Sequence, residues 1–206
     1  MTTSVVSSQV GSQDESENDK LETECVFRGF LKSKASQDRQ DDIERAIEGE
    51  LEADEPSLIN QQRNKQIGSQ LAAIADQLDV QYRHVIDGLI DELKLTSENA
   101  YDNFAVLARR LLARGVTWGN IVVLFCFGYR VILRFFSQNI PNLIRSLSDI
   151  MVRFVVTEKI SQWVKDHGGW IQVLNAGIGL ESPWYHYGAV AVGLISIVAL
   201  VVWWRK

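Results

Sequence analysis

Apolar residues recur every three or four positions along most of the chain after about residue 60, which is the spacing of one face of an α-helix. No segment alternates between apolar and polar residues as a half-buried strand does. Residue types that end helices or form turns interrupt the pattern at Thr96, Ser97, Gly115, residues 139–141, Gly168 and Gly169. The pattern therefore predicts an all-α domain over residues 21–180.

The most apolar helix is expected over residues 118–136, where only Arg130 and Arg134 are charged. A helix that is apolar on every side must be buried on every side, so this segment should be the hub of a bundle. Pro141 is expected to open the next helix, because proline fits the first helical turn. The apolar face of that helix should carry Leu143, Leu147, Ile150 and Phe154, with Arg145, Ser148, Asp149 and Arg153 elsewhere. The two helices should form an antiparallel hairpin, and each is near the length that spans a bilayer.

The N-terminal part of the chain is predominantly polar. Residues 1–20 are rich in Ser, Gln, Asp and Glu, and we predict that they are disordered because they have too little apolar surface to bury. Val26, Phe27, Phe30 and Leu31 predict a short first helix over residues 22–34. Residues 35–60 are again acidic and are expected to form a long mobile loop, with transient helix at most around residues 43–51.

The C-terminal run 187–204 contains no charged residue and is followed by Arg205 and Lys206. Its 18 residues would make roughly 27 Å of helix, enough to span a hydrocarbon core. Trp203 and Trp204 match the aromatic residues found at a membrane interface. We predict a C-terminal transmembrane anchor, with the body in the cytosol because residues near the N-terminus form no secretory signal.

Charge and chemistry narrow the function further. The net charge is −9 over residues 1–60, −2 over residues 61–100 and +6 over residues 101–206. An anionic lipid surface would attract the basic C-terminal half and repel the acidic N-terminal segment, so the asymmetry favours one orientation at the membrane. The sequence contains no basic stripe of the kind that binds nucleic acid. Cys25 and Cys126 lack metal-ligand spacing, and the three histidines are scattered. No nucleophile motif, phosphate loop or dinucleotide motif is visible, so the sequence predicts neither an enzyme nor a cofactor.

One amphipathic segment stands out as a candidate for partner recognition. Ile67, Leu71, Ile74 and Leu78 fall within about 60° on a helical wheel and form a narrow apolar ridge. Ala75 beside the ridge would permit close approach of a partner backbone, and Asp76 adds a single negative charge. Such a ridge fits helix-in-groove recognition, although any core-facing helix shows the same spacing.

Segments that follow one another in the family's order resemble the three homology motifs and the first helix of the Bcl (B-cell lymphoma two) family. Residues 67–78 resemble the third motif, and residues 98–104, 116–124 and 127–130 resemble the first motif with its preceding helix, in the version typical of the Bak branch. Residues 163–171 resemble the second motif, and residues 24–30 are similar to the first helix of that branch. Residues 139–145 look closer to the Bax branch.

The resemblance implies a bundle of about eight helices around the apolar hub, with a surface groove that binds partner helices. The groove residues that it implies are Tyr101, Phe104, Trp118, Gly119, Val122 and Trp170. Asn120 stands where the family pattern has an arginine for the motif aspartate, and asparagine offers no bidentate charged pair. This change should lower partner affinity by about 1 to 3 kcal/mol. Arg130 is an alternative partner for the carboxylate, although it lies further along the hub helix.

Two opposite functions share this architecture. In the executioner role, a Bak-like protein binds an activator helix, exposes its third motif, exchanges it with a second copy and permeabilises the mitochondrial outer membrane. In the guardian role, the groove sequesters the third motif of death-promoting relatives. The segments 98–104 and 127–130 favour the executioner. The expected partners are amphipathic helices of relatives, a second copy of the chain and membrane lipid. The endoplasmic reticulum is the alternative location to the mitochondrial outer membrane. A tail-anchored vesicle-fusion or adaptor protein is the more distant alternative function.

Overall fold

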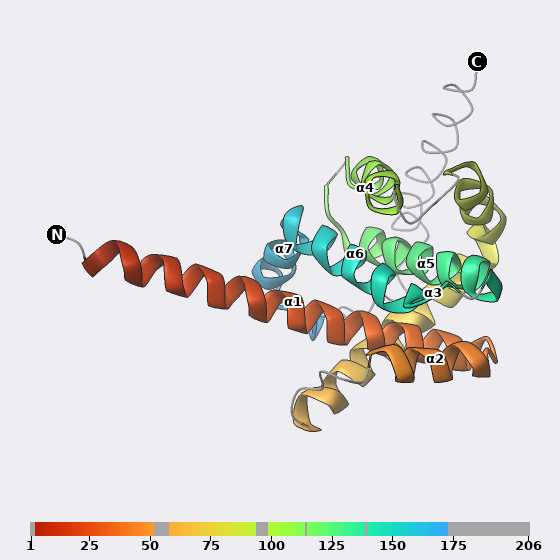
Figure 1. Cartoon of the computed structure of the whole chain (residues 1–206), viewed down its shortest axis with the longest axis horizontal. Helices are drawn as coiled ribbons and strands as arrows, with labels where there is room; N and C mark the ends of the chain where they lie inside the picture. Colours follow the sequence, from red (N-terminus) through yellow and green to blue (C-terminus); the bar gives the residue numbers. More distant parts are fainter. Residues whose placement is uncertain (1–2, 52–57, 94–98, 114, 139, 173–206) are drawn as a thin grey trace, which may run out of the picture.

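The structure, a computed structural model, describes residues 3–51, 58–93, 99–113, 115–138 and 140–172, and side chains from Glu17 on, except those of residues 58–61, 78–82, 85 and 93. Within these ranges the chain forms seven α-helices and one 3₁₀-helix and contains no strand, so the all-α prediction is confirmed. The helices are α1 Thr3–Gln37, α2 Asp41–Leu51, α3 Leu58–Leu93, α4 Ala100–Leu111, α5 Trp118–Phe135, η2 Phe136–Gln138, α6 Leu143–Thr157 and α7 Ile160–Asp166 (Figure 1).

Helix α5 is the hub of the bundle. Thr117 adopts an extended conformation and its hydroxyl accepts a hydrogen bond from the Asn120 amide, which starts the helix. The ten residues from Asn120 to Tyr129 are all buried, and α1, α3 and α6 pack around the helix. Among the described helices, only the segment Trp118–Gln138 is long and apolar enough to cross a membrane, and most of it is buried inside the bundle.

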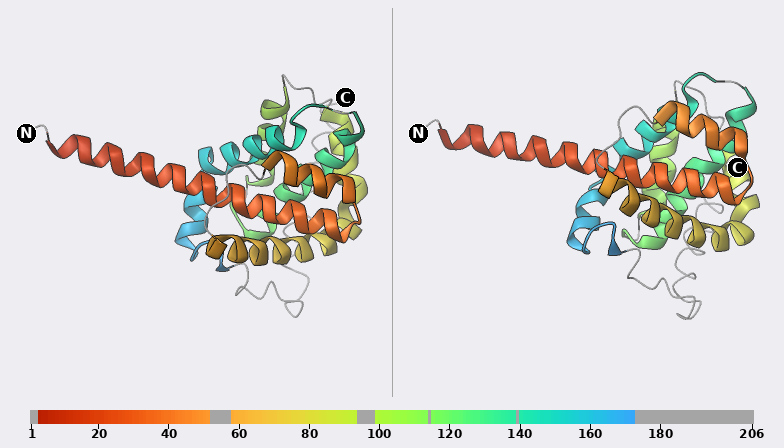
Figure 2. Two further views of the ribbon diagram at one scale, coloured as in Figure 1. Left: turned by 60° about the horizontal axis from the view of Figure 1, so that its bottom comes forward. Right: turned by 90° about the horizontal axis from the view of Figure 1, so that it is seen from below.

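The closest helix pair is α1 with α3. A Cβ atom built on Gly68 would lie 2.3 Å from the carbonyl carbon of Gly29, so the two backbones touch where both helices carry glycine. Val26, Phe27, Phe30 and Leu31 of α1 are fully buried beside this contact. Figure 2 shows α1 lying between α2 on one side and α3 on the other.

Helix α2 corrects the prediction of a mobile loop for its part of residues 35–60. Asp41, Asp42 and Glu44 in its first turn favour the helix N-terminus. Ile43, Ile47 and Leu51, which are spaced four residues apart, are buried. The Arg28 guanidinium donates to the Leu51 carbonyl at 2.8 Å. Helix α2 is therefore a packed element that rests on α1 and α6.

The N-terminal half of α1 also differs from prediction, because the helix begins at Thr3 and not near residue 22. Once the buried turns have nucleated a helix, each further residue adds one hydrogen bond without a second nucleation step. Two carboxylates of this polar segment find cations on neighbouring helices: Asp19 pairs with Lys165 at 2.6 Å and Glu22 with Arg63 at 2.6 Å. In Figure 1 the helix extends beyond the bundle toward its N-terminus.

Helices α5 and α6 are joined by the short connection 136–142 and pack against each other, so they form a hairpin. Helix α6 begins at Leu143 and not at Pro141, because Asn142 adopts the left-handed conformation with φ 54°. The expected polar position Ser148 is buried, whereas Leu147 and Ile150 are only partly buried. The proposed anchor, residues 187–204, lies outside the described residues.

Candidate helix-binding site

The predicted apolar ridge lies on α3 and faces inward. Ile67, Leu71 and Ala75 have no exposed surface, and Ile74 is 5% exposed. The side chain of Leu78 is outside those described. Helix α3 packs against both α1 and α5, so the ridge is buried inside the chain's own bundle. In this conformation the ridge is not available to a partner.

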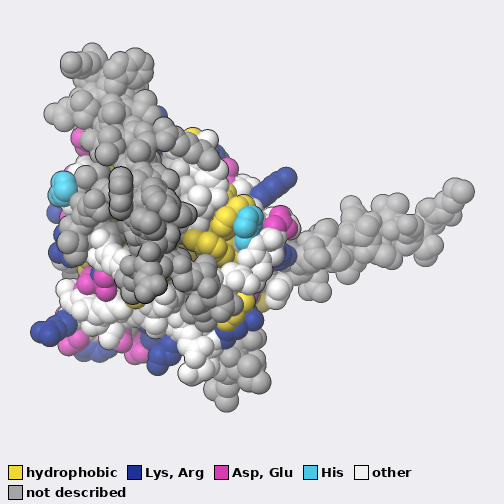
Figure 3. All heavy atoms as spheres, turned by 180° about the vertical axis from the view of Figure 1, so that it is seen from behind, with side chains coloured by type: hydrophobic (Ala, Val, Ile, Leu, Met, Phe, Trp, Pro, Cys, Tyr) yellow, Lys and Arg dark blue, Asp and Glu magenta, His cyan; other side chains and the backbone are white. Residues whose placement is uncertain are grey.

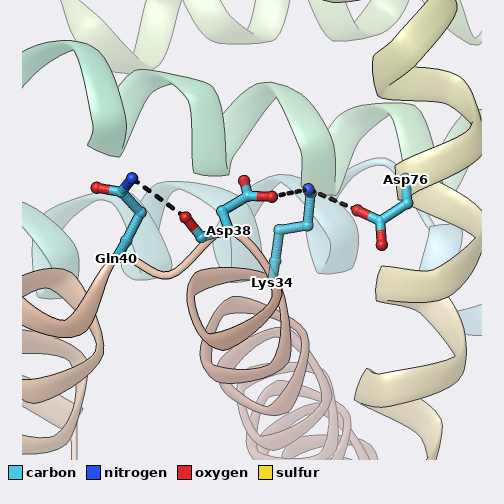
Figure 4. Close-up of polar contacts among 4 residues, drawn as sticks. All are labelled: Lys34, Asp38, Gln40 and Asp76. Carbon is cyan, nitrogen blue, oxygen red and sulfur yellow. Dashed lines mark hydrogen bonds and ion pairs between the residues drawn. The ribbon is translucent and has the colours of Figure 1, made fainter.

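The motif aspartate is held by a lysine of α1. The ammonium of Lys34 donates to Asp76 Oδ1 at 2.6 Å and to Asp38 Oδ1 at 2.8 Å (Figure 4). The Lys34 side chain is only 3% exposed, whereas those of Asp76 and Asp38 are 44% and 23% exposed. The ammonium also lies 5.6 Å from the centre of the Tyr129 ring. We refer to Lys34, Asp38 and Asp76 as the lysine clamp.

Opposing effects set the charge state of the clamp. Burial alone would lower the pKa of Lys34, but the hydrogen bonds to Asp38 and Asp76 and their negative charges outweigh it and raise the pKa above 10.5. Lys34 is therefore charged at neutral pH. It ties the end of α1 to the third-motif segment of α3.

Asn120 has no contact with the motif aspartate. Its side-chain amide donates to the carbonyls of Gly115 at 3.0 Å and Leu111 at 3.4 Å, and the residue is 8% exposed. These bonds hold the connection between α4 and α5. In this structure Asn120 therefore serves the fold and not the recognition of a carboxylate.

Arg130 pairs with Asp87 of α3 and not with Asp76. Its Nε donates to Asp87 Oδ1 at 2.9 Å, and its terminal nitrogen makes a second bond to Oδ2, so the pair is bidentate. One turn further along both helices, Arg134 pairs with Asp91 at 2.8 Å. The two ion pairs join the C-terminal half of α3 to the hub helix.

A small apolar cavity of about 20 Å³ lies between α3, α4 and α5. This is roughly the volume that holds a single water-sized probe. Its walls contain no exposed polar surface and consist of Ile86, Leu89, Leu107, Leu111, Val123, Leu124 and Phe127. A groove at this position is nearly closed, and a helix can enter it only if α3 and α4 separate.

Two of the predicted groove residues on α4 are occupied by internal contacts. Phe104 is 5% exposed, and its ring contacts Phe127 and Phe154 with centroids 5.8 and 5.4 Å away. Tyr101 is half-buried, with the Arg153 guanidinium 4.0 Å from its ring centre. Phe104 thus belongs to the core next to the cavity, and Tyr101 lies at the edge of the core.

The predicted residues of α5 and the second motif gather at the other end of the bundle. Trp118 is half-buried, and its ring centroid lies 5.2 Å from that of Trp163 and 6.1 Å from that of Trp170. Gly168 and Gly169 have positive φ values of 89° and 77°, which turn the chain after α7 and bring Trp170 onto Phe125. Val122 is fully buried and Gly119 is half-buried. In Figure 3 hydrophobic side chains gather at the surface near this end.

The sequence reasoning missed the cavity residues on α3 and α4 and the lysine clamp. Phe127 belongs to the motif segment 127–130, but Ile86, Leu89 and Leu107 carry no signal beyond ordinary helical spacing. Lys34 stands at the end of the expected helix 22–34, and nothing in the sequence marks it as buried. Only the fold shows that it is buried against Asp76.

The fold defines a class: an all-helical bundle around one apolar helix, with an amphipathic motif helix packed beneath its own α1. The family model described as "Apoptosis regulator proteins, Bcl-2 family" matches residues 71–170. Human Bcl-2 homologous antagonist/killer is 29% identical over 163 residues, covering 77% of this chain and 74% of the relative. Apoptosis regulator R1 of Xenopus laevis is 27% identical, covering 65% of this chain and 62% of the relative.

Solved structures agree on the fold. Trichoplax adhaerens trBcl-2L2 bound to trBak BH3 has a TM-score of 0.60 at 20% identity, covering 77% of this chain and 98% of that one. Chicken BOK has a TM-score of 0.60 at 17% identity, covering 78% of this chain and 97% of that one. The chain belongs to the Bcl-2 family of apoptosis regulators.

Proposed function

We propose that this protein is a Bak-like pro-apoptotic effector whose third motif, residues 67–78, is stored in an inactive position. A death-motif helix of another family member binds the groove between α3, α4 and α5. The protein then releases the motif, exchanges it with a second copy and permeabilises the mitochondrial outer membrane. The C-terminal segment 187–204 anchors it there, with the body facing the cytosol.

The observation that carries this proposal is the storage of the motif. The ridge is buried inside the bundle, and the motif aspartate is bound by a buried lysine that belongs to the same chain. An effector that exchanges its motif needs such an inactive state. The similarity to human Bcl-2 homologous antagonist/killer over about three quarters of both chains supports the same role.

The apolar length of α5 supports the membrane step. The segment Trp118–Gln138 is long enough to span a bilayer, although it is buried in the bundle before activation. Unpacking α1 and α3 would expose the hub pair α5 and α6 to lipid. The damage would then come from this hairpin, and the anchor would only select the membrane.

The test locks α1 to α3. Ser33 and Ser69 share a hydrogen bond with their oxygens 3.0 Å apart, so Ser33→Cys with Ser69→Cys brings two thiols within reach of a disulfide. The full-length double variant is placed in dye-filled vesicles of mitochondrial outer-membrane lipids. A synthetic peptide of residues 63–83 serves as the activating helix. We expect no dye release from the oxidised protein and release at the wild-type rate after reduction.

The disulfide between α1 and α3 is a better test than a charged substitution on the apolar ridge. Leu71 is fully buried, so Leu71→Glu would destabilise the fold whether or not the motif is exchanged. The reduced double variant is the matched control, because it has the same sequence as the oxidised protein. Dye release from the oxidised, disulfide-linked protein would show that separation of α1 and α3 is not required.

The guardian function is the second candidate. Chicken Bcl-2-like protein 1 is 24% identical over 68% of this chain, and the Trichoplax structure holds a BH3 segment of another protein. A guardian would capture the 63–83 peptide tightly and release no dye, even when reduced. That result would replace the effector proposal.

A further inference from the structure

A polar pocket of about 600 Å³ lies between α1, α2 and α3, and the proposed mechanism does not use it (Figure 2). This volume is within the range of sites for small molecules. Its wall contains three serines, the cations Arg28, Lys32 and Lys65, and the carboxylates Glu44 and Glu48. In contrast to the apolar cavity between α3, α4 and α5, such a wall suits a charged ligand.

A buried asparagine in this wall lacks a hydrogen-bond donor. Asn64 is 6% exposed, and its side-chain oxygen accepts no hydrogen bond from any residue that the structure describes. Its backbone is fixed, because the Asn64 carbonyl packs against α1 at Gly29, where a Cβ atom would come within 2.8 Å. Buried amide oxygens are rarely left without a donor in folded proteins. The oxygen therefore indicates a donor that is supplied from the pocket.

Positive charge gathers at the same end of the pocket. Lys65 directly follows Asn64 on α3, is exposed, and forms no ion pair with the part of the chain that the structure describes. Arg28 directly precedes Gly29, on which Asn64 packs. Its guanidinium donates to the Leu51 carbonyl and also lines the pocket. An anionic group of a ligand would be attracted to this end.

The α2 side of the pocket carries the opposite charge. Glu48 is paired with Lys32 at 2.9 Å. Glu44, one turn earlier on α2, is half-buried and forms no ion pair among the described residues. A cationic group of a ligand would be attracted to this side. The wall is therefore complementary to a ligand that carries charges of both signs.

From these groups we infer that the pocket binds a phosphate that carries a primary ammonium. A phosphate offers more acceptor oxygens than a carboxylate to the ammonium of Lys65, the guanidinium of Arg28 and the nearby hydroxyls. The ligand's ammonium donates to the Asn64 oxygen and faces the carboxylates of α2. Free phosphoethanolamine and the headgroup of the corresponding phospholipid share this chemistry.

Binding at this site would hold the third motif in its stored position. The wall of the pocket comes from α1 and α3 as well as α2, and the proposed mechanism separates α1 from α3. A ligand that binds only the closed arrangement stabilises it by mass action. This consequence rests on the proposed function, whereas binding itself does not.

The first experiment measures affinity by calorimetry on the full-length protein in maltoside micelles. The probes are O-phosphoethanolamine, O-phosphocholine and inorganic phosphate. O-phosphocholine has the same phosphate and a cation without an N–H group, so it cannot donate to the Asn64 oxygen. We expect O-phosphoethanolamine to bind at least about fivefold tighter than either of the other two probes.

Protein variants assign the affinity to individual side chains. Asn64→Ala should reduce the ratio of O-phosphoethanolamine to O-phosphocholine affinity to about one, because the acceptor is gone. Lys65→Gln should weaken all three probes by at least about threefold and keep that ratio. Arg45→Gln is the control: Arg45 also lies on α2, but its side chain is 74% exposed and is not part of the wall, so its removal should change no affinity. Urea unfolding confirms that each variant is folded.

The second experiment separates the two sources of the ligand. Full-length protein in dye-filled vesicles is activated with the 63–83 peptide. If a free metabolite is the ligand, soluble O-phosphoethanolamine slows dye release from phosphatidylcholine vesicles by at least about twofold. If the lipid is the ligand, release from vesicles that contain phosphatidylethanolamine is slower for the wild type than for Asn64→Ala, and the two proteins are equal in vesicles that lack it.

The outcomes separate this inference from the proposed function. Equal affinities for O-phosphoethanolamine and O-phosphocholine in the wild type, or a preference that persists in Asn64→Ala, would overturn the site. Binding without an effect on dye release from either source would overturn the stabilisation of the stored motif. If the peptide never releases dye, the effector proposal fails, and the calorimetric ratio still decides whether the pocket binds its ligand.

Discussion

Replacing Lys34 by methionine tests how much the lysine clamp stabilises the stored motif. Lys34 makes two charge-assisted hydrogen bonds, each of which contributes about 1.5 to 3 kcal/mol when both partners are present. Lys34→Met removes both bonds but also removes the buried charge, and the two carboxylates are exposed enough to be hydrated. We expect the free energy of unfolding to fall by only about 1 to 2 kcal/mol.

Removing the carboxylates should be more harmful than removing the lysine. Asp38→Asn combined with Asp76→Asn eliminates both ion pairs and leaves the buried ammonium without a counter-charge, at a cost of about 3 to 5 kcal/mol. Urea unfolding of the full-length protein measures both values. Hydrogen exchange of the amides in residues 67–76 reports whether the motif opens faster. If Lys34→Met destabilises as much as the double carboxylate variant, the argument from desolvation is wrong.

The clamp also has a defined pH dependence. Because the folded pKa of Lys34 is raised above the ordinary value of 10.5, its contribution is complete below that value and is lost as pH rises through the folded pKa. The difference in unfolding free energy between wild type and Lys34→Met should therefore be constant from about pH 7 to 9.5 and shrink only above about 10.5. A difference that already shrinks near pH 8 would contradict the raised pKa.

The other predictions concern packing and connections. Gly68→Ala should destabilise the fold by about 1 to 3 kcal/mol in urea unfolding, because its Cβ would collide with the Gly29 backbone. Gly88→Ala, on the same helix with open space around it, should stabilise by about 0.5 to 1 kcal/mol. Asn120→Ala should cost about 1 to 3 kcal/mol in thermal unfolding through the lost bonds to the α4–α5 connection. Arg145→Ala removes the guanidinium bond to the Glu50 carbonyl but keeps the bond from the Arg145 backbone amide to the Glu50 carboxylate, and it should speed hydrogen exchange in α2 without changing exchange in α5.

The hub helix could be predicted almost to the residue, because residues 121–129 are apolar on every side and allow no other placement. The buried ridge of α3 could also be predicted as a ridge, since its periodicity is unambiguous. Helical spacing does not say what covers such a ridge, and here it is buried in a bundle in which α3 packs against α1 and α5. The sequence offered the same two readings, groove ligand and core, and the structure shows the second for this conformation.

The errors have one physical source. Local composition made the segment of α2 look like a solvated loop, yet three apolar residues four positions apart are enough once α1 and α6 provide a surface. Likewise, Asn120 looked like a weakened arginine because only its position in a motif was visible. Its actual role depends on the carbonyls of Leu111 and Gly115, which no pattern in the sequence places beside it.

The glycine contact between α1 and α3 determines how the stored motif can be released. With no side chain between the two backbones, the attraction depends on surfaces in direct contact, and it weakens sharply over less than an ångström of separation. Such an interface has few intermediate positions, because the two backbones are either in contact or separated. We therefore expect release of the motif to be all-or-none in each molecule, so that a graded increase in stimulus raises the number of activated copies and not the degree to which each one opens.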